Sequence, residues 1–213
     1  MADLIQWEAF PGQILDTTGV DMLAAKTWAT PLDLEQFQRV TGKTAFPDFL
    51  QKAISGEKLE VLSNGEMNYT LNGKHAKVSV IWNYEAPEGT GDTHYSMMRG
   101  TKANLIIRQG KAENFKPTLY VKLLEGQKSV LENLINTELQ PKYLGITLTE
   151  LKNGEYRVEI PEAFHVGHES HFAQVTEQFL TYLKANKMPD WEVPNMLVKY
   201  YTTTKSLEKA MEK

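Results

Sequence analysis

Titratable side chains gather in one short segment, residues 89–110, which reads GTGDTHYSMMRGTKANLIIRQG. Asp92 stands two residues before His94, and a histidine beside a carboxylate can hold a polar ligand or act as an acid or base. On an extended chain Asp92, His94 and Ser96 share one face, and the residues between them share the other. Arg99 adds a fixed positive charge. A solvated strand face is the alternative without chemistry.

The glycines of this segment do not predict a phosphate-binding loop. Such a loop needs a strand before it and a helix N-terminus after it, whose amides hold the phosphates. Here the sequence that follows Gly91 is typical of strand, turn and strand. We predict a loop over 85–92, a strand over 93–99 and a strand over 103–109, with Gly100 in the turn adopting backbone angles that other residues avoid.

Three histidines form the second candidate site. His165, His168 and His171 are spaced three residues apart in HVGHESH. On a helix His168 and His171 lie about 60° apart, close enough to share one ion. The His-Glu-x-x-His spacing of metallohydrolases is missing, and zinc would need a third ligand. We therefore predict no metal, with the histidines at a helix N-terminus or lining a cleft.

Composition excludes several classes of function. The chain has 213 residues, a net charge of -4 and no cysteine. It therefore has no basic footprint for nucleic acid, no disulfide and no cysteine nucleophile. No apolar run approaches the roughly 20 residues of a membrane span. The tryptophan and tyrosine rings can either stack on a sugar ring or pack in the protein core. The composition does not indicate the cellular compartment.

Apolar residues alternate with polar ones in EMNYTL, HAKVSVIWN and EYRVEI. A period of two with one polar face indicates half-exposed antiparallel strands. Asn64-Gly65, Asn72-Gly73 and Asn153-Gly154 follow or separate such runs, and Asn-Gly is the strongest signal for a two-residue hairpin turn. In the second run we expect Ala76, Val78, Val80 and Trp82 to face a helix-covered core, and Lys77, Ser79, Ile81 and Asn83 to face the opposite side.

Several segments predict helices. Asp33 caps LEQFQRVT with Gln36 three residues on, and Gly42 ends it. A short helix follows Pro47. Longer ones fall in SVLENLINTELQ, in HFAQVTEQFLTYLKAN with Phe172, Val175, Phe179 and Leu183 on one face, and in the last twenty residues. The predicted fold class is α+β, with an open, mainly antiparallel sheet and helices packed on one face.

Several stretches carry a family resemblance: DLIQWEAFPGQ near the start, the run from NGEMNYTL to NLIIRQG at 64–110, HESHFAQVTEQFLTYL and WEVPNMLVKYYTTT. Together they resemble the C-terminal half of a bacterial branch of the glucose–fructose oxidoreductase / inositol dehydrogenase (Gfo/Idh/MocA) family, over nearly the whole chain. The resemblance implies one substrate-binding and oligomerisation domain over residues 1–213. Its partners would be a sugar or sugar derivative and, through the sheet face, a second subunit.

The same resemblance implies an N-terminal Rossmann domain that binds NAD or NADP and supplies a Glu-Lys-Pro lysine. Neither that motif nor a glycine fingerprint is present here, so we expect the chain not to catalyse hydride transfer in isolation. Asp3 resembles the aspartate of the family's hinge helix, whose histidine would precede Met1, and residues 1–10 resemble a remnant of that helix. The candidate substrate-binding residues are Asp92, His94, Arg99, Tyr84, His168 and His171.

Two other functions stay open. One is a stand-alone carbohydrate-binding or interaction module without chemistry, and the other is a metal-dependent enzyme that uses the histidines at 165–171. An interface on the open sheet face is expected to involve Ile81 and Ile106, because apolar side chains grouped on an exposed face favour association.

Overall fold

The computed structural model describes residues 2–125 and 128–212, which form two compact units. One unit holds the chain up to Glu85 together with everything from Pro189 onward, and the other holds Ala86–Met188. Both contain an open antiparallel sheet with helices, so the predicted fold class is confirmed. The strands divide between two sheets, however, and do not form a single meander. That the chain acts as one substrate-binding domain stays a prediction.

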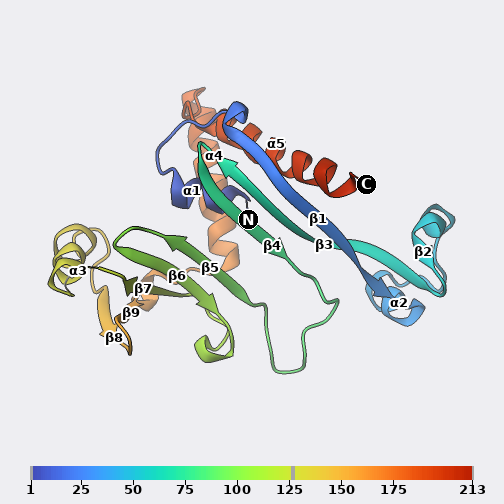
Figure 1. Cartoon of the computed structure of the whole chain (residues 1–213), viewed down its shortest axis with the longest axis horizontal. Coiled ribbons are helices and arrows are strands. Elements are labelled where there is room, and N and C mark those ends of the chain that lie inside the picture. The colour runs from blue at the N-terminus through green and yellow to red at the C-terminus, as the bar shows by residue number, and fades with distance from the viewer. Residues whose placement is uncertain (1, 126–127, 213) are drawn as a thin grey trace. The chain divides into compact units, whose positions relative to one another are not determined.

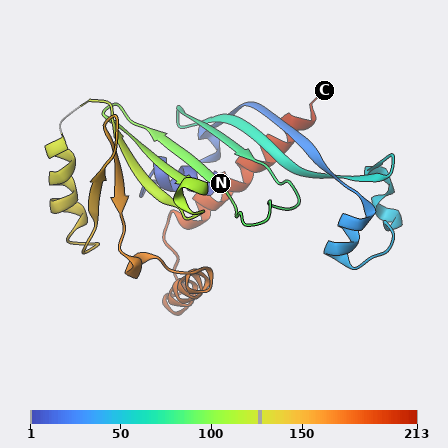
Figure 2. The same cartoon turned by 90° about the horizontal axis from the view of Figure 1, so that it is seen from below.

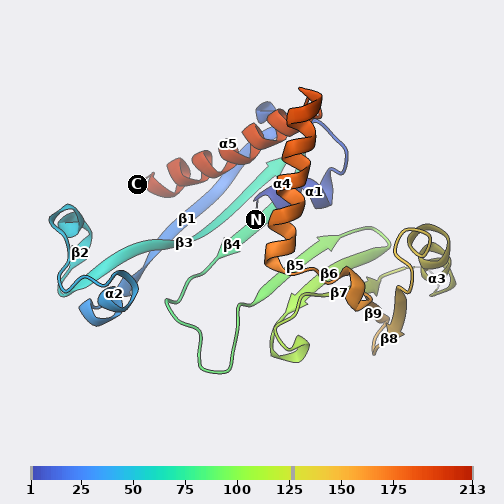
Figure 3. The same ribbon diagram turned by 180° about the vertical axis from the view of Figure 1, so that it is seen from behind.

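The first unit is built on a four-stranded sheet in which β3 pairs with β1, β2 and β4 (Figure 1). Its elements are α1 (Ala2–Ala9), η1 (Thr17–Gly19), β1 (Val20–Leu32), α2 (Leu34–Thr41), η2 (Asp48–Ala53), β2 (Ile54–Ser55), β3 (Lys58–Leu71), β4 (Lys74–Val80) and α5 (Glu192–Met211). Helix α5 lies along β1, and α1 packs on α5 (Figure 3). The core lies on this helix-covered face, and its buried residues are Ala2, Phe10, Leu15, Met67, Tyr69, Leu71, Val78 and Val198.

The second unit is built on a five-stranded sheet in the order β5-β6-β7-β9-β8 (Figure 2). Its elements are β5 (His94–Arg99), β6 (Ala103–Gln109), η3 (Lys111–Glu113), β7 (Thr118–Leu123), α3 (Lys128–Leu134), the π-helix η4 (Ile135–Leu139), β8 (Thr147–Glu150), β9 (Glu155–Glu159), η5 (Glu162–Phe164) and α4 (His168–Ala185). Helices α3 and η4 cover one sheet face, where the core residues are Val121, Leu131, Ile135, Ile146, Tyr156 and Val158.

Several helix ends and turns lie where the local sequence predicted them. Asp33 accepts a hydrogen bond from the Gln36 amide while the Gln36 side chain accepts from Asp33, and Gly42 ends α2 in the left-handed region. This is the predicted capping box with its glycine stop. The hairpin of β3 and β4 turns at Asn72 and Gly73, with φ of 46° and 73°. Both values suit a type I′ turn.

Three expectations were wrong in detail. Asn64 and Gly65 lie inside β3, paired with Trp28 and Thr27, and form no turn. Val80 is 47% exposed and Trp82 38% exposed, because β4 ends at Val80 and alternation ends with it. Gly100 has no positive φ; it is needed because a Cβ there would lie 2.7 Å from the Ala103 carbonyl oxygen.

The remaining pattern of β4 is as expected. Val78 is buried and Ala76 packs against the same core, while Lys77 on the other face lies 3.1 Å from a Glu66 carboxylate oxygen. Ile81 follows the strand and Ile106 lies in the second sheet, so the two do not share the face of one sheet. Among the described residues, no helix is apolar and long enough to span a membrane.

Candidate functional site

The second sheet has one face that α3 and η4 do not cover, and it carries the densest polar network of that unit. Residues opposite each other in an antiparallel pair point to the same face. Ile106 pairs with Tyr120, Tyr120 with Arg157, and Arg157 with Thr149. The register therefore assigns to this face a set that includes Tyr95, Met97, Arg99, Asn104, Ile106, Arg108, Thr118, Tyr120, Lys122, Thr149, Glu155, Arg157 and Glu159.

Arg108 on β6 and Glu155 on β9 form a two-pronged ion pair. Nη1 lies 2.7 Å from Oε1 and Nη2 lies 2.8 Å from Oε2. The guanidinium also stacks over the Tyr120 ring, 4.5 Å from its centroid. The hydrogen bond from Arg108 holds the pKa of Glu155 below its ordinary value. A planar guanidinium can pair with both carboxylate oxygens and stack on an aromatic ring at once, which a lysine ammonium cannot do.

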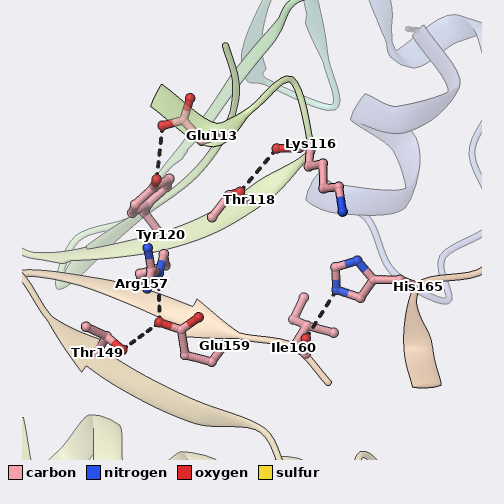
Figure 4. A network of polar contacts seen from close by, with 9 residues as sticks. All are labelled: Glu113, Lys116, Thr118, Tyr120, Thr149, Arg157, Glu159, Ile160 and His165. Carbon is pink, nitrogen blue, oxygen red and sulfur yellow. Dashed lines mark hydrogen bonds and ion pairs between the residues drawn. The ribbon is translucent and has the colours of Figure 1, made fainter. Parts of the chain in front are cut away.

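Tyr120 connects this pair to the β6–β7 loop. Its hydroxyl donates to Glu113 Oε1 at 3.0 Å, and Glu113 Oε2 accepts from the Gly110 amide at 3.1 Å. Figure 4 shows Glu113 and Arg157 on opposite sides of the ring. Burial, aided by the bond to Glu113, raises the pKa of Tyr120. Tyr120 is therefore a hydrogen-bond donor at neutral pH and not a general base.

The outer strands β8 and β9 add a second charged group. Arg157 Nε lies 2.7 Å from Glu159 Oε1, and Thr149 Oγ1 donates to the same oxygen at 2.5 Å (Figure 4). Burial raises the pKa of Glu159, but the bonds from Thr149 and Arg157 outweigh it and the pKa lies below the ordinary value. Each carboxylate described here therefore has a cation or donor beside it.

A depression borders this face, lined by Lys122, Glu150, Leu151, Lys152, Asn153 and Glu155. Asn153 and Gly154 form the β8–β9 turn beside it, both with positive φ as the sequence predicted. The arrangement offers paired donors and acceptors around an aromatic ring. It can bind a polar ligand through hydrogen bonds, but it presents no activated nucleophile or free base among the described residues.

The sequence-predicted residues around 89–110 do not form one cluster. His94 begins β5 and Arg99 ends it, and because they are five positions apart their side chains point to opposite faces. The carbonyl oxygen of Asp92 accepts a hydrogen bond from Gln109 at 3.0 Å. Asp92 and His94 therefore stay together at one end of β5, while Arg99 belongs to the open face described above.

Tyr84 lies in the first unit and has a positive φ of 67°. Its hydroxyl donates to the Gln36 carbonyl at 3.2 Å, and its ring packs edge-on against Trp82. The Arg39 guanidinium lies over the ring, 5.9 Å from its centroid, and pairs with Glu85 at 3.2 Å. These contacts hold the chain against α2 where the first unit ends.

The histidine candidates lie in and before α4. His171 is exposed in that helix, whereas the side chain of His168 lies outside the described residues. The ring of His165 lies 3.2 Å from the Ile160 carbonyl oxygen (Figure 4). Among the side chains that the structure describes, which exclude that of His168, no group of three metal-binding side chains was found. Asp3 is exposed in the first turn of α1.

Sequence reasoning did not single out Arg108, Tyr120, Glu155 or Arg157 as site residues. The signal available was the alternation in NLIIRQG, TLYVKLL and EYRVEI, which places them on the polar side of predicted strands. Alternation alone does not give the strand order β6-β7-β9 that brings them together.

The chain belongs to the family described as "Putative oxidoreductase C terminal domain", whose model matches residues 1–211. It is similar to a solved protein described as "a putative oxidoreductase from Parabacteroides merdae ATCC 43184", with 48% identity and a TM-score of 0.93. The match covers 98% of this chain and 49% of that one, so this chain spans about half of its length. No match was found among curated proteins.

Proposed function

We propose that this chain is the substrate-binding half of a nicotinamide-dependent oxidoreductase of the Gfo/Idh/MocA kind, acting on a sugar or sugar derivative. One observation carries the proposal: the 48%-identical protein described as "a putative oxidoreductase" shares this fold over only 49% of its own length. The other half of such a protein is long enough for a nucleotide-binding domain.

The residues of this chain do not fit a dinucleotide. Gly89 and Gly91 lie in the segment closest to a glycine-rich loop, and the strand β5 follows them where a helix N-terminus would be needed. In the proposed protein NAD or NADP is bound by the other domain and carries the hydride chemistry. Asp3, on α1, is proposed as the hinge-helix aspartate.

The role of this chain is to bind and orient the sugar. On this face of the second sheet Arg108, Arg157 and their glutamates offer donors and acceptors for hydroxyl groups, and the buried Tyr120 supports Arg108 from below. Asp92 and His94 at the start of β5 are proposed as further substrate contacts, together with Arg99, Tyr84, His168 and His171. A polar ligand held between charged hydrogen-bond partners is bound with defined orientation, which is what hydride transfer requires of a substrate domain.

Calorimetry on the isolated chain tests this proposal. A panel of sugars and polyols should include at least one ligand, and NAD(H) and NADP(H) should show no submillimolar binding. Arg157→Ala should abolish the sugar signal. Lys205→Ala is the matched control, because Lys205 forms a similar exposed pair at 2.7 Å from Glu208 in the other unit. Submillimolar binding of a nicotinamide cofactor to this chain would overturn the proposal.

Oligomerisation through a sheet face is part of the same proposal. Ile81 is 61% exposed directly after β4, where an interface would cover it. Sedimentation of the wild type and of Ile81→Lys checks it. A dimer that is lost in the variant supports the interface, and an unchanged sedimentation coefficient contradicts it.

A further inference from the structure

Helix α4 carries an apolar stripe that the sequence placed on one face and that the structure leaves exposed. Val175, Phe179 and Leu183 are 67%, 59% and 63% exposed, and Leu180 beside them is 45% exposed. At about 100° per residue these side chains fall within roughly a third of the helix circumference. Phe172, about two turns before Phe179, continues the stripe and is 61% exposed. Figure 3 shows α4 as one uninterrupted helix.

A helix of 18 residues with this composition needs packing to be stable. A fully buried aromatic side chain covers about 150–250 Å², and the five stripe residues are about half to two-thirds exposed, so covering the stripe removes about 500 Å² from solvent on one helix. Two such helices together bury about 1,000 Å², which reaches the lower limit for a specific interface. The stripe of one copy is thus large enough to cover that of another.

We propose that α4 pairs antiparallel with α4 of a second copy of this chain, about a two-fold axis near Glu177 and Gln178. The stripe is nearly symmetric about that point. Val175 then packs on Leu180 of the second copy, and Leu180 packs on its Val175, as an isologous interface requires. Phe179 lies close to the axis and packs beside Thr176 of the second copy.

The charges on α4 favour the antiparallel direction. Glu169 lies in the first turn, Lys184 lies in the last turn, and Lys187 follows the helix end. Antiparallel pairing puts the glutamate of each copy near the lysines of the other, whereas parallel pairing puts like charges side by side. A second copy of the chain is therefore the occupant that both the apolar pattern and the charge pattern fit. This stripe contains none of the proposed sugar contacts, although His168 and His171 lie in the first turn of the same helix.

Cross-linking tests the axis directly, because the chain contains no cysteine that would compete. In Thr176→Cys the two thiols lie about 5 Å apart along the helix axes, and in Leu183→Cys about 16 Å. Treated with a short bismaleimide, Thr176→Cys should give a covalent dimer and Leu183→Cys should give less than a tenth as much. Equal dimer from both variants contradicts the antiparallel pair, and no dimer from either contradicts self-association.

A charge-insertion pair provides the second measurement. Val175→Glu with Phe179→Glu should raise the dimer dissociation constant at least 100-fold in sedimentation equilibrium. Gln174→Glu, on the opposite side of the same helix, should change it less than threefold. Far-ultraviolet circular dichroism controls for loss of folding. A wild type that stays monomeric at high concentration overturns the proposal, and it leaves the sugar-binding measurements unaffected.

Discussion

Two polar networks of this protein, one in each sheet, differ in charge and in burial. The first sheet places a neutral amide, Asn64, at its interior, where only 4% of the residue is exposed. The second sheet places ion pairs on its open face, and the best of them, Arg108 with Glu155, has side chains 34% and 17% exposed. The network of Asn64 is buried and uncharged, and that of Arg108 and Glu155 is charged and partly exposed to solvent.

The amide of Asn64 is fully used. Its Nδ2 donates to the Trp28 carbonyl at 3.1 Å and to Thr30 Oγ1 at 2.9 Å, and its Oδ1 accepts from the Trp82 amide at 2.7 Å. These partners lie where the β1–β3 register shifts and where β4 has ended. Asn64 therefore satisfies backbone groups that the broken ladder would leave unpaired.

The difference explains why the network of Arg108, Tyr120 and Arg157, and not that of Asn64, is proposed as a binding surface. A neutral side chain can be buried once its bonds are made, and at 4% exposure Asn64 offers no surface to a ligand. Charged groups that keep contact with water pay less desolvation when they exchange partners. The network of Arg108, Tyr120 and Arg157 can therefore rearrange around a polar molecule, whereas that of Asn64 cannot.

The largest effect is expected from Asn64→Ala. The substitution removes the side-chain partner of the Trp82 amide and of the Trp28 carbonyl, whereas the Thr30 hydroxyl keeps its bonds to Ser63 and to the Trp82 carbonyl. The free energy of unfolding should fall by about 2–4 kcal/mol. The shift of the urea midpoint measures it. Asn68→Ala, on the same strand and half-buried, is the matched control and should cost less than about 0.5 kcal/mol. Equal losses in both variants would contradict the special role of Asn64.

A smaller loss is expected from Arg108→Lys. The variant keeps the charge but loses one prong of the pair with Glu155 and the stacking on Tyr120. A cost of about 1 kcal/mol follows for a partly exposed pair. Urea unfolding again measures it. A loss as large as that of Asn64→Ala would mean that the two sheets do not differ as described.

Acid should weaken the second sheet through Glu155. The pKa of Glu155 is lowered in the folded protein by Arg108. Its contribution is therefore complete above the unfolded pKa of about 4.3 and is lost as the pH falls through the lower folded value. Solvent screening keeps it under about 1 kcal/mol. Glu155→Gln should flatten the stability profile below pH 5 relative to wild type. An unchanged acid slope in this variant would contradict the role of the pair.

Local sequence signals predicted much of this fold because many elements follow from nearby residues. The capping box of α2, the turn at Asn72-Gly73 and the buried faces of Met67, Tyr69 and Leu71 depend on neighbours within a few positions. The division into two sheets, the end of β4 at Val80 and the grouping of Arg108 with Glu155 depend on strand pairing. That pairing joins residues far apart in sequence, which periodicity does not specify.

The candidate site shows the same limit. Asp92 and His94 were found by residue type, and their closeness follows from sequence alone. Arg99 stands on the opposite face because a strand alternates, which the sequence also indicated. Tyr120 and Arg157 become neighbours only through the β7–β9 pairing. A single sequence offered no means of choosing that order of strands.

The smallest predicted effect concerns two glycines that follow asparagines. Gly73 has a φ of 73° in its turn, so Gly73→Ala should cost about 1 kcal/mol. Gly65 has no positive φ, and a Cβ there would meet the Lys26 carbonyl oxygen at 3.8 Å, an ordinary contact.

Because glycine weakens a strand interior, Gly65→Ala should raise the free energy of unfolding by about 0.5 kcal/mol. Thermal melts of the two variants check the pair, since opposite signs are expected from the same substitution. A destabilised Gly65→Ala would mean that the strand around Asn64 requires glycine. The register shift between β1 and β3 would then stabilise this sheet in addition to the Asn64 amide. The contrast with the charged network would depend on backbone conformation as well as on hydrogen bonds.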